Sequence, residues 1–390
     1  MNPPPVLEPQ QHGDRKVPSI AASRTTRIEG LDSIRFVCAL WVFFSHCGGI
    51  PLVEGADPHH PVGWLVRGIY GAFYCGPAAV IVFFVVSGFC IHFPYRNARS
   101  VPVVSFLARR YIRIGIPAAV AMGLATLVGM ESLLLHRSSF ALGLESIRKV
   151  NDRDVAIIWS LVCEMIYYTL YPALFAARRR IGWKPILAGS YVAALGVILL
   201  RPDAGSYPDF GHFLNWIVGL PCWLLGCIVA ESINTTPNYM VAAKRMWLLR
   251  FGVWSASMVA LLLRFHSPVG YPWSLTVFGA LAAWWLVQEL RYHQLASPWR
   301  VLEWAGAWSY SIYLAHVLAI PLLARVGLQL DFPMLGPNLN WALRSVLILA
   351  FCWGFYLVIE RPSHLLARVA GSWLGKQRAT SRQVPAAAQV

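Results

Sequence analysis

One short stretch, GLDSIRFVCALWVFFSHCGG from Gly30 to Gly49, is apolar enough to enter a membrane and yet carries ionisable side chains. Asp32 and Arg35 lie near its start and His46 near its end. Arg35 and His46 are eleven residues apart, or about three helical turns, so a helix places both on one face, roughly 16 Å apart along its axis. Asp32 joins that face and can pair with Arg35. A neutral imidazole there could act as a general base.

Charged side chains inside hydrocarbon are costly, and they are rare there without a function. The same stretch also fits a simpler interpretation, in which Asp32 and Arg35 anchor the helix at the membrane interface. His46 would then be a hydrogen-bonded packing residue. Taken alone, the stretch favours neither interpretation.

A basic cluster follows in SFLARRYIRIGIP. Arg110 and Arg113 are three residues apart and share a face of a helix that enters the membrane. Two guanidinium groups there could hold a phosphate by bidentate hydrogen bonds. Taken alone, the cluster favours the simpler interpretation, in which these positive residues anchor the helix on the cytoplasmic side. Just upstream, VFFVVSGFCIHFP contains Ser87 and Gly88, which are small enough to let helices approach closely.

A third candidate group lies in IIWSLVCEMIYYTLYP. Trp159, Ser160 and Glu164 begin an apolar segment from its outer side, with Glu164 about one turn inside. An unpaired carboxylate at that depth would be costly. Glu164 therefore either serves the chemistry or pairs with an arginine or a tyrosine.

A fourth group lies in WSYSIYLAHVLAIP, where Tyr310, Tyr313 and His316 follow one another at intervals of three residues. A single histidine on an apolar face is usually a hydrogen-bonded core residue. A second intramembrane histidine in the same chain adds only a little to the case for a site.

The elements that must position these groups are predicted from composition. The chain has 390 residues, 57% of them hydrophobic and 13% charged, whereas soluble domains average about 25% charged. Ten apolar segments are each long enough for a membrane helix of roughly 20 residues. They cover residues 31–51, 72–93, 113–134, 156–176, 185–201, 212–231, 247–265, 273–290, 304–326 and 340–360. We expect an all-α, polytopic transmembrane bundle of about ten spans.

The distribution of Lys and Arg predicts the orientation. These residues gather in 94–112, in 177–184 and in both tails, whereas 202–211 and 327–339 have almost none. The positive-inside rule then places both termini in the cytoplasm. Segment 135–155 is an exception, because it should lie outside but has four basic residues. Either it contacts something acidic, or the third and fourth spans are drawn wrongly.

The remaining composition narrows the class of partner. The net charge of +15 is explained by cytoplasmic loops that face anionic membrane lipids, so no nucleic-acid partner is expected. The eight Cys are scattered without metal-ligand spacing, which predicts buried thiols and no metal site. Residues 1–27 are expected to be a disordered cytoplasmic tail without a signal peptide, and 28–362 the transmembrane domain. Residues 363–390 are expected to form a cytoplasmic C-terminal tail that is disordered from Gly375 onward.

These segments together resemble the acyltransferase 3 family of integral membrane O-acyltransferases. GLDSIRFVCALWVFFSH resembles its first-span motif, an Arg and a His with ten residues between them. FFVVSGF is similar to its FFxxSGF element, RRYIR to its RxxR element, WSLVCE to its WSLxxE segment and SYSIYLAH to its SYxxYLxH segment. IERP resembles the end of its last core span, and the matches run in order from residue 28 to 362. Cys163 and Met165 depart from the pattern, because another Glu or a Gln is common beside Glu164.

The resemblance implies a multi-pass protein of the bacterial inner membrane that moves an acyl group, commonly acetyl, from cytoplasmic acyl-coenzyme A. The acceptor would be a sugar hydroxyl of a surface glycan or lipid-linked intermediate, and no metal is implied. His46 would be the general base, although a covalent acyl-histidine route stays open. Glu164 would orient the acceptor or polarise His46. Substrate contacts are expected from Asp32, Arg35, Ser87, Arg110, Arg113, Trp159, Ser160, Tyr310, Tyr313 and His316.

Two other functions remain possible at this point. A transporter or flippase would also have ten spans and intramembrane charges. The sequence shows no convincing repeat between its halves and no paired broken helices, which such a protein often has. An acyltransferase-like protein without catalysis could instead serve in glycan assembly, but the presence of His46 argues against it.

Overall fold

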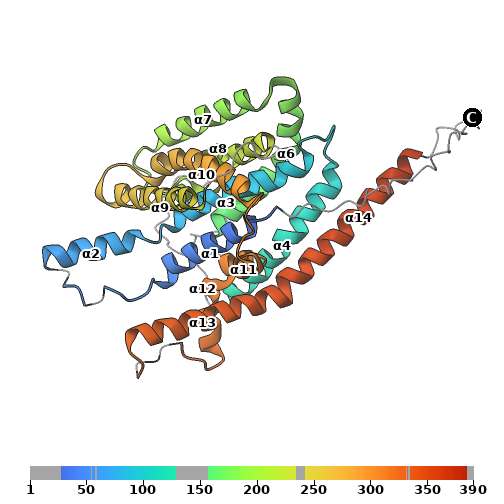
Figure 1. The fold of residues 1–390 in the computed structure, drawn as a ribbon. Helices are drawn as coiled ribbons and strands as arrows, with labels where there is room; N and C mark the ends of the chain where they lie inside the picture. Colours follow the sequence, from blue (N-terminus) through green and yellow to red (C-terminus); the bar gives the residue numbers. More distant parts are fainter. Residues whose placement is uncertain are drawn as a thin grey trace, which may run out of the picture.

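The computed structural model describes residues 28–53, 55–57, 59–128, 157–233, 242–330, 332 and 334–383, and this part of the chain is helical without a strand. Figure 1 shows the arrangement of the helices. In chain order they are α1 (Leu31–Cys47), α2 (Pro61–Ala72), α3 (Gly76–His92), α4 (Val103–Leu127), α6 (Ile158–Ile181), α7 (Trp183–Leu200), α8 (Gly211–Ser232), α9 (Ala243–His266), α10 (Tyr271–His293), α11 (Arg300–Gly306), α12 (Ser309–Arg325), α13 (Pro337–Phe355) and α14 (Arg361–Gln383). Short helical turns lie at η1 (Phe93–Tyr95), η5 (Tyr207–Phe210) and η6 (Tyr356–Glu360). The predicted all-α class is confirmed.

Each of the ten predicted apolar segments overlaps a helix. Segment 304–326 contains two, α11 and α12, which meet at 65°. Helix α4 begins at Val103, before the predicted residue 113, so the RRYIR arginines lie well inside it. The basic segment 135–155 and the tail 1–27 lie outside the described residues, and the predictions for them stand as they were.

The number of helices does not by itself give the number of membrane crossings. Within the described residues, six helices are long and apolar enough to cross a membrane, or seven if α11 and α12 form one bent span. Both α1 and α12 have 17 residues, which is about 26 Å of helix against a hydrocarbon core of about 30 Å. The chain is a multi-pass membrane protein, and ten spans with both termini in the cytoplasm stay a prediction.

Helix α3 lies at the centre of the bundle, with α1, α6, α8 and α10 packed around it (Figure 1). It is apolar on all sides and buried at almost every position, as expected for a helix surrounded by protein. Glycines set its spacing to α8. A Cβ on Gly88 would lie 1.9 Å from the carbonyl oxygen of Trp223, and one on Gly226 would lie 1.9 Å from that of Val85. This close approach fixes the position of Ser87, the residue before Gly88.

At the C-terminal end, α13, η6 and α14 form one long rod beside α4 (Figure 1). The predicted disorder from Gly375 onward is therefore wrong as far as Gln383, where α14 ends. Ser363, Ala367 and Gly371 form a buried row of small residues at four-residue spacing. The row lets α14 lie against α4, and a Cβ on Gly371 would meet the Arg109 side chain at 2.3 Å. An apolarity search misses such a helix, because it is mostly polar.

Candidate active site

Helix α1, which carries three of the candidate residues, is fixed at its N-terminus by a carboxylate from α11. Glu303 Oε1 accepts hydrogen bonds from the backbone N–H of Gly30 (3.1 Å) and of Ser33 (3.0 Å), and from the Ser33 hydroxyl (2.7 Å). The first N–H groups of a helix have no partner within the helix, and a negative charge there also favours the helix dipole. This contact sets the axial position of α1 against α11 and α12.

At the opposite end of α1, His46 meets His316 of α12. His46 Nδ1 lies 2.9 Å from His316 Nε2, and the ring planes differ by 6°. His316 is fully buried, whereas His46 is exposed. The two histidines are 270 residues apart in sequence, and their pairing joins two segments that sequence analysis treated separately.

The hydrogen bonds of this pair determine where its protons lie. His316 Nδ1 lies 2.7 Å from the carbonyl oxygen of Ile312, which only accepts, so His316 Nδ1 carries a hydrogen. In a neutral His316, Nε2 then accepts, and His46 Nδ1 is the donor to it. His46 Nε2 is left with a lone pair and without a partner among the described residues. It is the nitrogen that can take a proton from a substrate.

A cavity of about 370 Å³ lies between α1, α3, α4, α6, α12 and the start of α14. It gathers most of the predicted site residues. Those that line it are Asp32, Arg35, Ser87, Arg110, Arg113, Ser160, Glu164, Tyr310 and Tyr313. His46 and His316 are not in its lining, but His316 follows Tyr313 by three residues on α12, less than one turn further along. The cavity and the histidine pair therefore lie one after the other along α12.

Two of the three arginines in the cavity are already engaged. The predicted ion pair between Arg35 and Asp32 forms at 3.0 Å, and Arg35 also lies 3.1 Å from Cys90 Sγ. Arg113 Nε donates to His364 Nε2 at 3.1 Å. Both arginines are thereby held in place, and each keeps further N–H groups that could reach a ligand.

Arg110 differs from them, because it has no carboxylate partner among the described residues. Its guanidinium carbon lies 5.9 Å from the ring centres of Phe106 and Tyr168. Aromatic faces attract a cation weakly and without occupying its N–H groups. Arg110 therefore keeps its hydrogen-bonding capacity for an anionic ligand.

Glu164 lies with this cavity rather than with the histidines. Its Oε1 accepts from Ser87 Oγ at 2.5 Å and from the hydroxyl of Tyr168, one turn along α6. Among the described residues it has no contact with His46, so the structure does not support the expectation that it polarises this ring. The partner that the sequence left open is a tyrosine and a serine.

The tyrosines of α12 connect its helix to two others. Tyr313 OH lies 2.5 Å from Ser160 Oγ and donates to the carbonyl of Ile157 at 3.1 Å, joining α12 to the start of α6. Tyr310 OH donates to the carbonyl of Ile114 on α4 at 3.0 Å. Trp159 does not line the cavity and packs on Phe84 and Tyr207, and its contact with substrate stays a prediction.

Sequence reasoning did not single out several residues of the cavity, among them Cys90, Glu360 and His364. Glu360 is buried and accepts from the backbone N–H and hydroxyl of Ser311, and its other oxygen lies 3.4 Å from His364. Glu360 belongs to the IERP motif, and His364 follows it at i+4, which would have placed both on one helix face. His364 was missed because the chain from residue 363 onward was expected to be a tail.

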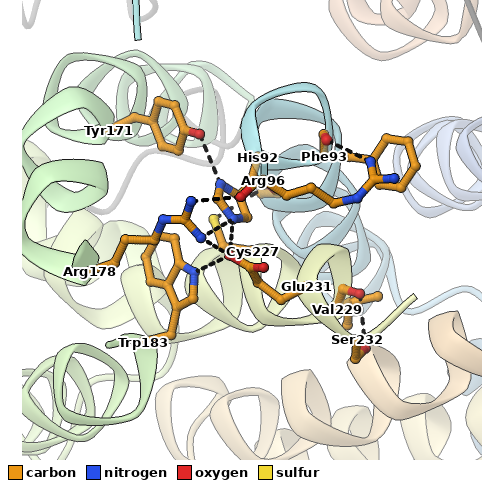
Figure 2. A network of polar contacts seen from close by, with 11 residues as sticks. His92, Phe93, Arg96, Tyr171, Arg178, Trp183, Cys227, Val229, Glu231 and Ser232 are labelled. Atoms are coloured by element: carbon orange, nitrogen blue, oxygen red, sulfur yellow. Dashed lines mark hydrogen bonds and ion pairs between the residues drawn. The ribbon is translucent and has the colours of Figure 1, made fainter. Parts of the chain in front are cut away.

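A second polar cluster lies away from the cavity, where α3, α6 and α8 meet, and Figure 2 shows it. His92 Nδ1 lies 2.9 Å from Tyr171 OH, and His92 Nε2 lies 2.8 Å from Glu231 Oε1. Glu231 also accepts from Arg178 and from Trp183 Nε1. His92 is fully buried and both of its ring nitrogens are occupied. This arrangement joins helices and leaves His92 no capacity for a substrate.

A larger and mostly apolar cavity of about 620 Å³ lies on the other side of α1, towards α9 and α10. Aromatic rings such as Trp41, Phe73 and Trp254 line it. Its charged groups are an ion pair, in which Glu289 accepts from Arg250 at 2.7 and 2.9 Å. None of the predicted site residues lies in its lining, whereas nine of them line the smaller, charged cavity.

Comparison with known proteins identifies the family of the chain. A family model described as an acyltransferase domain matches residues 28–357, which contain all of the predicted site residues. The chain is also 26% identical over 312 residues to the exopolysaccharide production protein ExoZ of Rhizobium meliloti (strain 1021), covering 74% of this chain and 90% of that protein. No solved structure is significantly similar to the chain.

Proposed function

Because this chain belongs to the acyltransferase 3 family, we propose that it moves an acyl group, acetyl in the simplest case, from acyl-coenzyme A to a sugar hydroxyl. The acceptor would belong to a surface polysaccharide or to its lipid-linked intermediate, as the name of the relative, exopolysaccharide production protein ExoZ, suggests. One observation carries the proposal. A cavity with an uncommitted arginine lies next along α12 to a histidine pair, in which one ring nitrogen has no partner among the described residues.

The donor would enter the charged cavity from the cytoplasmic side. Coenzyme A carries phosphates, which suit the guanidinium group of Arg110 and the remaining N–H groups of Arg113. Its pantetheine arm carries amide N–H groups, for which the carboxylate of Glu164 is an acceptor. Arg35, paired with Asp32, would keep the charge of the site balanced. The acyl end would then pass Tyr313 towards the histidines.

The proposed chemistry follows from the proton positions of the histidine pair. His46 Nε2 takes the proton of the acceptor hydroxyl while that oxygen attacks the thioester carbonyl carbon. The new C–O bond forms, the C–S bond breaks, and coenzyme A leaves as a thiolate that recovers the proton from His46. His316 holds His46 in the required tautomer throughout. The alternative, a covalent acyl-histidine intermediate, uses the same nitrogen as nucleophile.

The place of the reaction follows from the orientation predicted for the chain. With both termini in the cytoplasm, the start of α1 faces the cytoplasm, and His46 at its other end lies towards the outside. A cytoplasmic donor and an exported acceptor would then meet inside the bundle. We propose the bacterial inner membrane as its location, with membrane lipids around the helices.

A transfer assay on the purified protein tests the proposal. Protein in lipid nanodiscs is given radiolabelled acetyl-coenzyme A and a lipid-linked oligosaccharide extract, with the His46→Ala variant as control. We expect label to appear in the glycan with wild type alone, and mass spectrometry of surface glycans from cells with and without the protein to locate the ester. Movement of glycan across vesicle membranes without any label transfer would instead indicate a flippase.

A further inference from the structure

A single arginine of α13 lies at the outer end of α1 and belongs to none of the groups described above. Arg344 is the eighth residue of α13, roughly 10 Å along the helix from Pro337. Its Nε atom is buried without a hydrogen-bond partner. Among the described residues, Arg344 forms no hydrogen bond and no ion pair. An unpaired guanidinium within a membrane helix is costly, and such residues usually serve a function.

Contacts of its neighbour show which way this face of α13 points. Trp341, three residues earlier, donates from Nε1 to the carbonyl of Gly48 at 3.0 Å. Its ring stacks on Phe44 with 5.8 Å between the ring centres. Residues three apart share a helix face, so Arg344 also faces the C-terminal end of α1. His46 lies in the last turn of that helix.

Among the described residues, no carboxylate pairs with Arg344. The last turn of α1, towards which this face of α13 points, ends in His46 and Cys47, and neither is a carboxylate. The carboxylate of Glu164, in the charged cavity, already accepts from Ser87 and Tyr168. A positive group without a partner among the described residues, near the exposed general-base candidate His46, is suited to a negative group brought by the substrate.

We propose that Arg344 binds an anionic group of the acceptor, a carboxylate or phosphate on the sugar, and so presents the acceptor hydroxyl to His46. The inference rests on the proposed function, because it assigns the outer end of the site to the acceptor. It names the class of acceptor: an acidic sugar or sugar phosphate is preferred to a neutral one. A guanidinium forms two parallel hydrogen bonds to either anion, which would fix the orientation of the sugar ring as well as its position.

Two other roles for Arg344 give different results. It could extend to the outer interface and contact lipid phosphate, as arginines near helix ends do. It could also stabilise the C-terminal carbonyls of α1 by its charge alone. The first role depends on the lipid headgroup, and the second affects all acceptors equally. A binding comparison between a charged and a neutral sugar separates them.

The test uses methyl β-D-glucuronide and methyl β-D-glucoside as probes. Their binding to the full-length protein in phosphatidylcholine nanodiscs, with coenzyme A present, is measured by saturation-transfer NMR. We expect wild type to bind the glucuronide at least about tenfold more tightly than the glucoside. Arg344→Gln should remove that preference, and Arg344→Lys should keep part of it. Arg325→Gln, which changes an exposed arginine at the end of α12, is the matched control and should bind like wild type.

Every other pattern overturns the proposal. Equal binding of the two sugars, no binding of either, or a preference that survives Arg344→Gln would each exclude an acceptor site at this arginine. Loss of both sugars together in Arg344→Gln would indicate a structural role. An arginine bound to lipid phosphate, which phosphatidylcholine also carries, would show no preference for the glucuronide in these nanodiscs. This experiment measures no acyl transfer, so a negative result here does not contradict the proposed function. A negative result in the transfer assay, in turn, does not change the interpretation of the binding data.

Discussion

Two histidine clusters lie in this bundle, and they differ in how much of their hydrogen-bonding capacity is used. His92 has a partner at each ring nitrogen, Tyr171 on one side and Glu231 on the other, and it is fully buried (Figure 2). His46 is exposed, and within the described part of the chain it has a partner at Nδ1 and none at Nε2. Because a buried polar group without a partner costs free energy, packing alone favours the first arrangement. The second arrangement is the one expected of a reactive group.

The comparison extends to the charged residues around each cluster. Glu231 gathers His92, Arg178 and Trp183 into a network that joins α3, α6 and α8. Arg110 and Arg344, by contrast, have no carboxylate partner among the described residues. Unused hydrogen-bonding capacity is therefore found in the charged cavity and at the C-terminal end of α1. The number of ionisable residues does not separate the two regions, since both are rich in them.

The largest effect on acyl transfer is expected from the loss of His46 Nε2. His46→Ala should reduce acyl transfer by about 10²–10⁴-fold, because a general base contributes that much to rate. Donor affinity should stay near that of wild type, since proton transfer belongs to the transition state. Single-turnover transfer by folded, donor-binding protein is the measurement. Near-normal turnover would make His46 a packing residue and end the distinction drawn between the clusters.

His316 should matter less, because it acts on the substrate through His46. His316→Ala should lower turnover by about 10- to 100-fold, the range seen when a residue that orients a functional side chain is lost. His316→Gln offers an amide near the position of Nε2 and should recover part of the rate, with donor KM unchanged in both variants. If Ala and Gln are equally impaired and both lower the unfolding temperature, His316 is a core residue only.

Substitution of Arg110 tests the charged cavity, where the donor is proposed to bind. Arg110→Ala should weaken acyl-coenzyme A binding about tenfold, the lower end expected for a charge-assisted hydrogen bond. Lys should restore part of the affinity, since it keeps the charge but loses the planar fork. Arg109→Ala, one residue away on α4, is the matched control. Its Nε is bonded to the carbonyl of Ser105, and it does not line the cavity. Equal weakening in both variants would mean that general positive charge, rather than Arg110, holds the donor.

Local patterns in the sequence predicted the helices and the pairs within them. Apolar runs predicted the ten helical segments, and the three-residue spacing predicted the Asp32–Arg35 ion pair. Periodicity reports which residues share a face of a helix, but not which helix that face meets. The His46–His316 pair and the contact of Glu303 with Gly30 join residues about 270 positions apart, and nothing local encodes them.

Membrane chemistry hides other features from sequence analysis. A face that packs on protein and a face that meets lipid are both apolar, so the burial of α3 could not be told from its sequence. The depth of Glu164 along one helix did not reveal its partners, Ser87 of α3 and Tyr168 of α6. Arg344 was counted within an apolar segment and passed over. Its significance depends on the absence of a partner, which only the three-dimensional arrangement shows.

The smallest effect on acyl transfer is expected from a change in the His92 cluster, where both ring nitrogens of the histidine have partners. Glu231→Gln keeps the shape of the side chain but removes the charge that faces Arg178 and the ring of His92. Breaking a paired, partly buried charge destabilises the folded state, typically by about 1–3 kcal/mol for the groups left unsatisfied. We therefore expect a lower unfolding temperature in detergent, measured by fluorescence-detected size exclusion, with turnover per folded molecule within about twofold of wild type. Glu289→Gln, at the Arg250 ion pair beside the apolar cavity, should behave alike. A loss of turnover in Glu231→Gln at unchanged stability would show that this cluster takes part in the reaction, and that full use of hydrogen-bonding capacity does not mark a structural histidine.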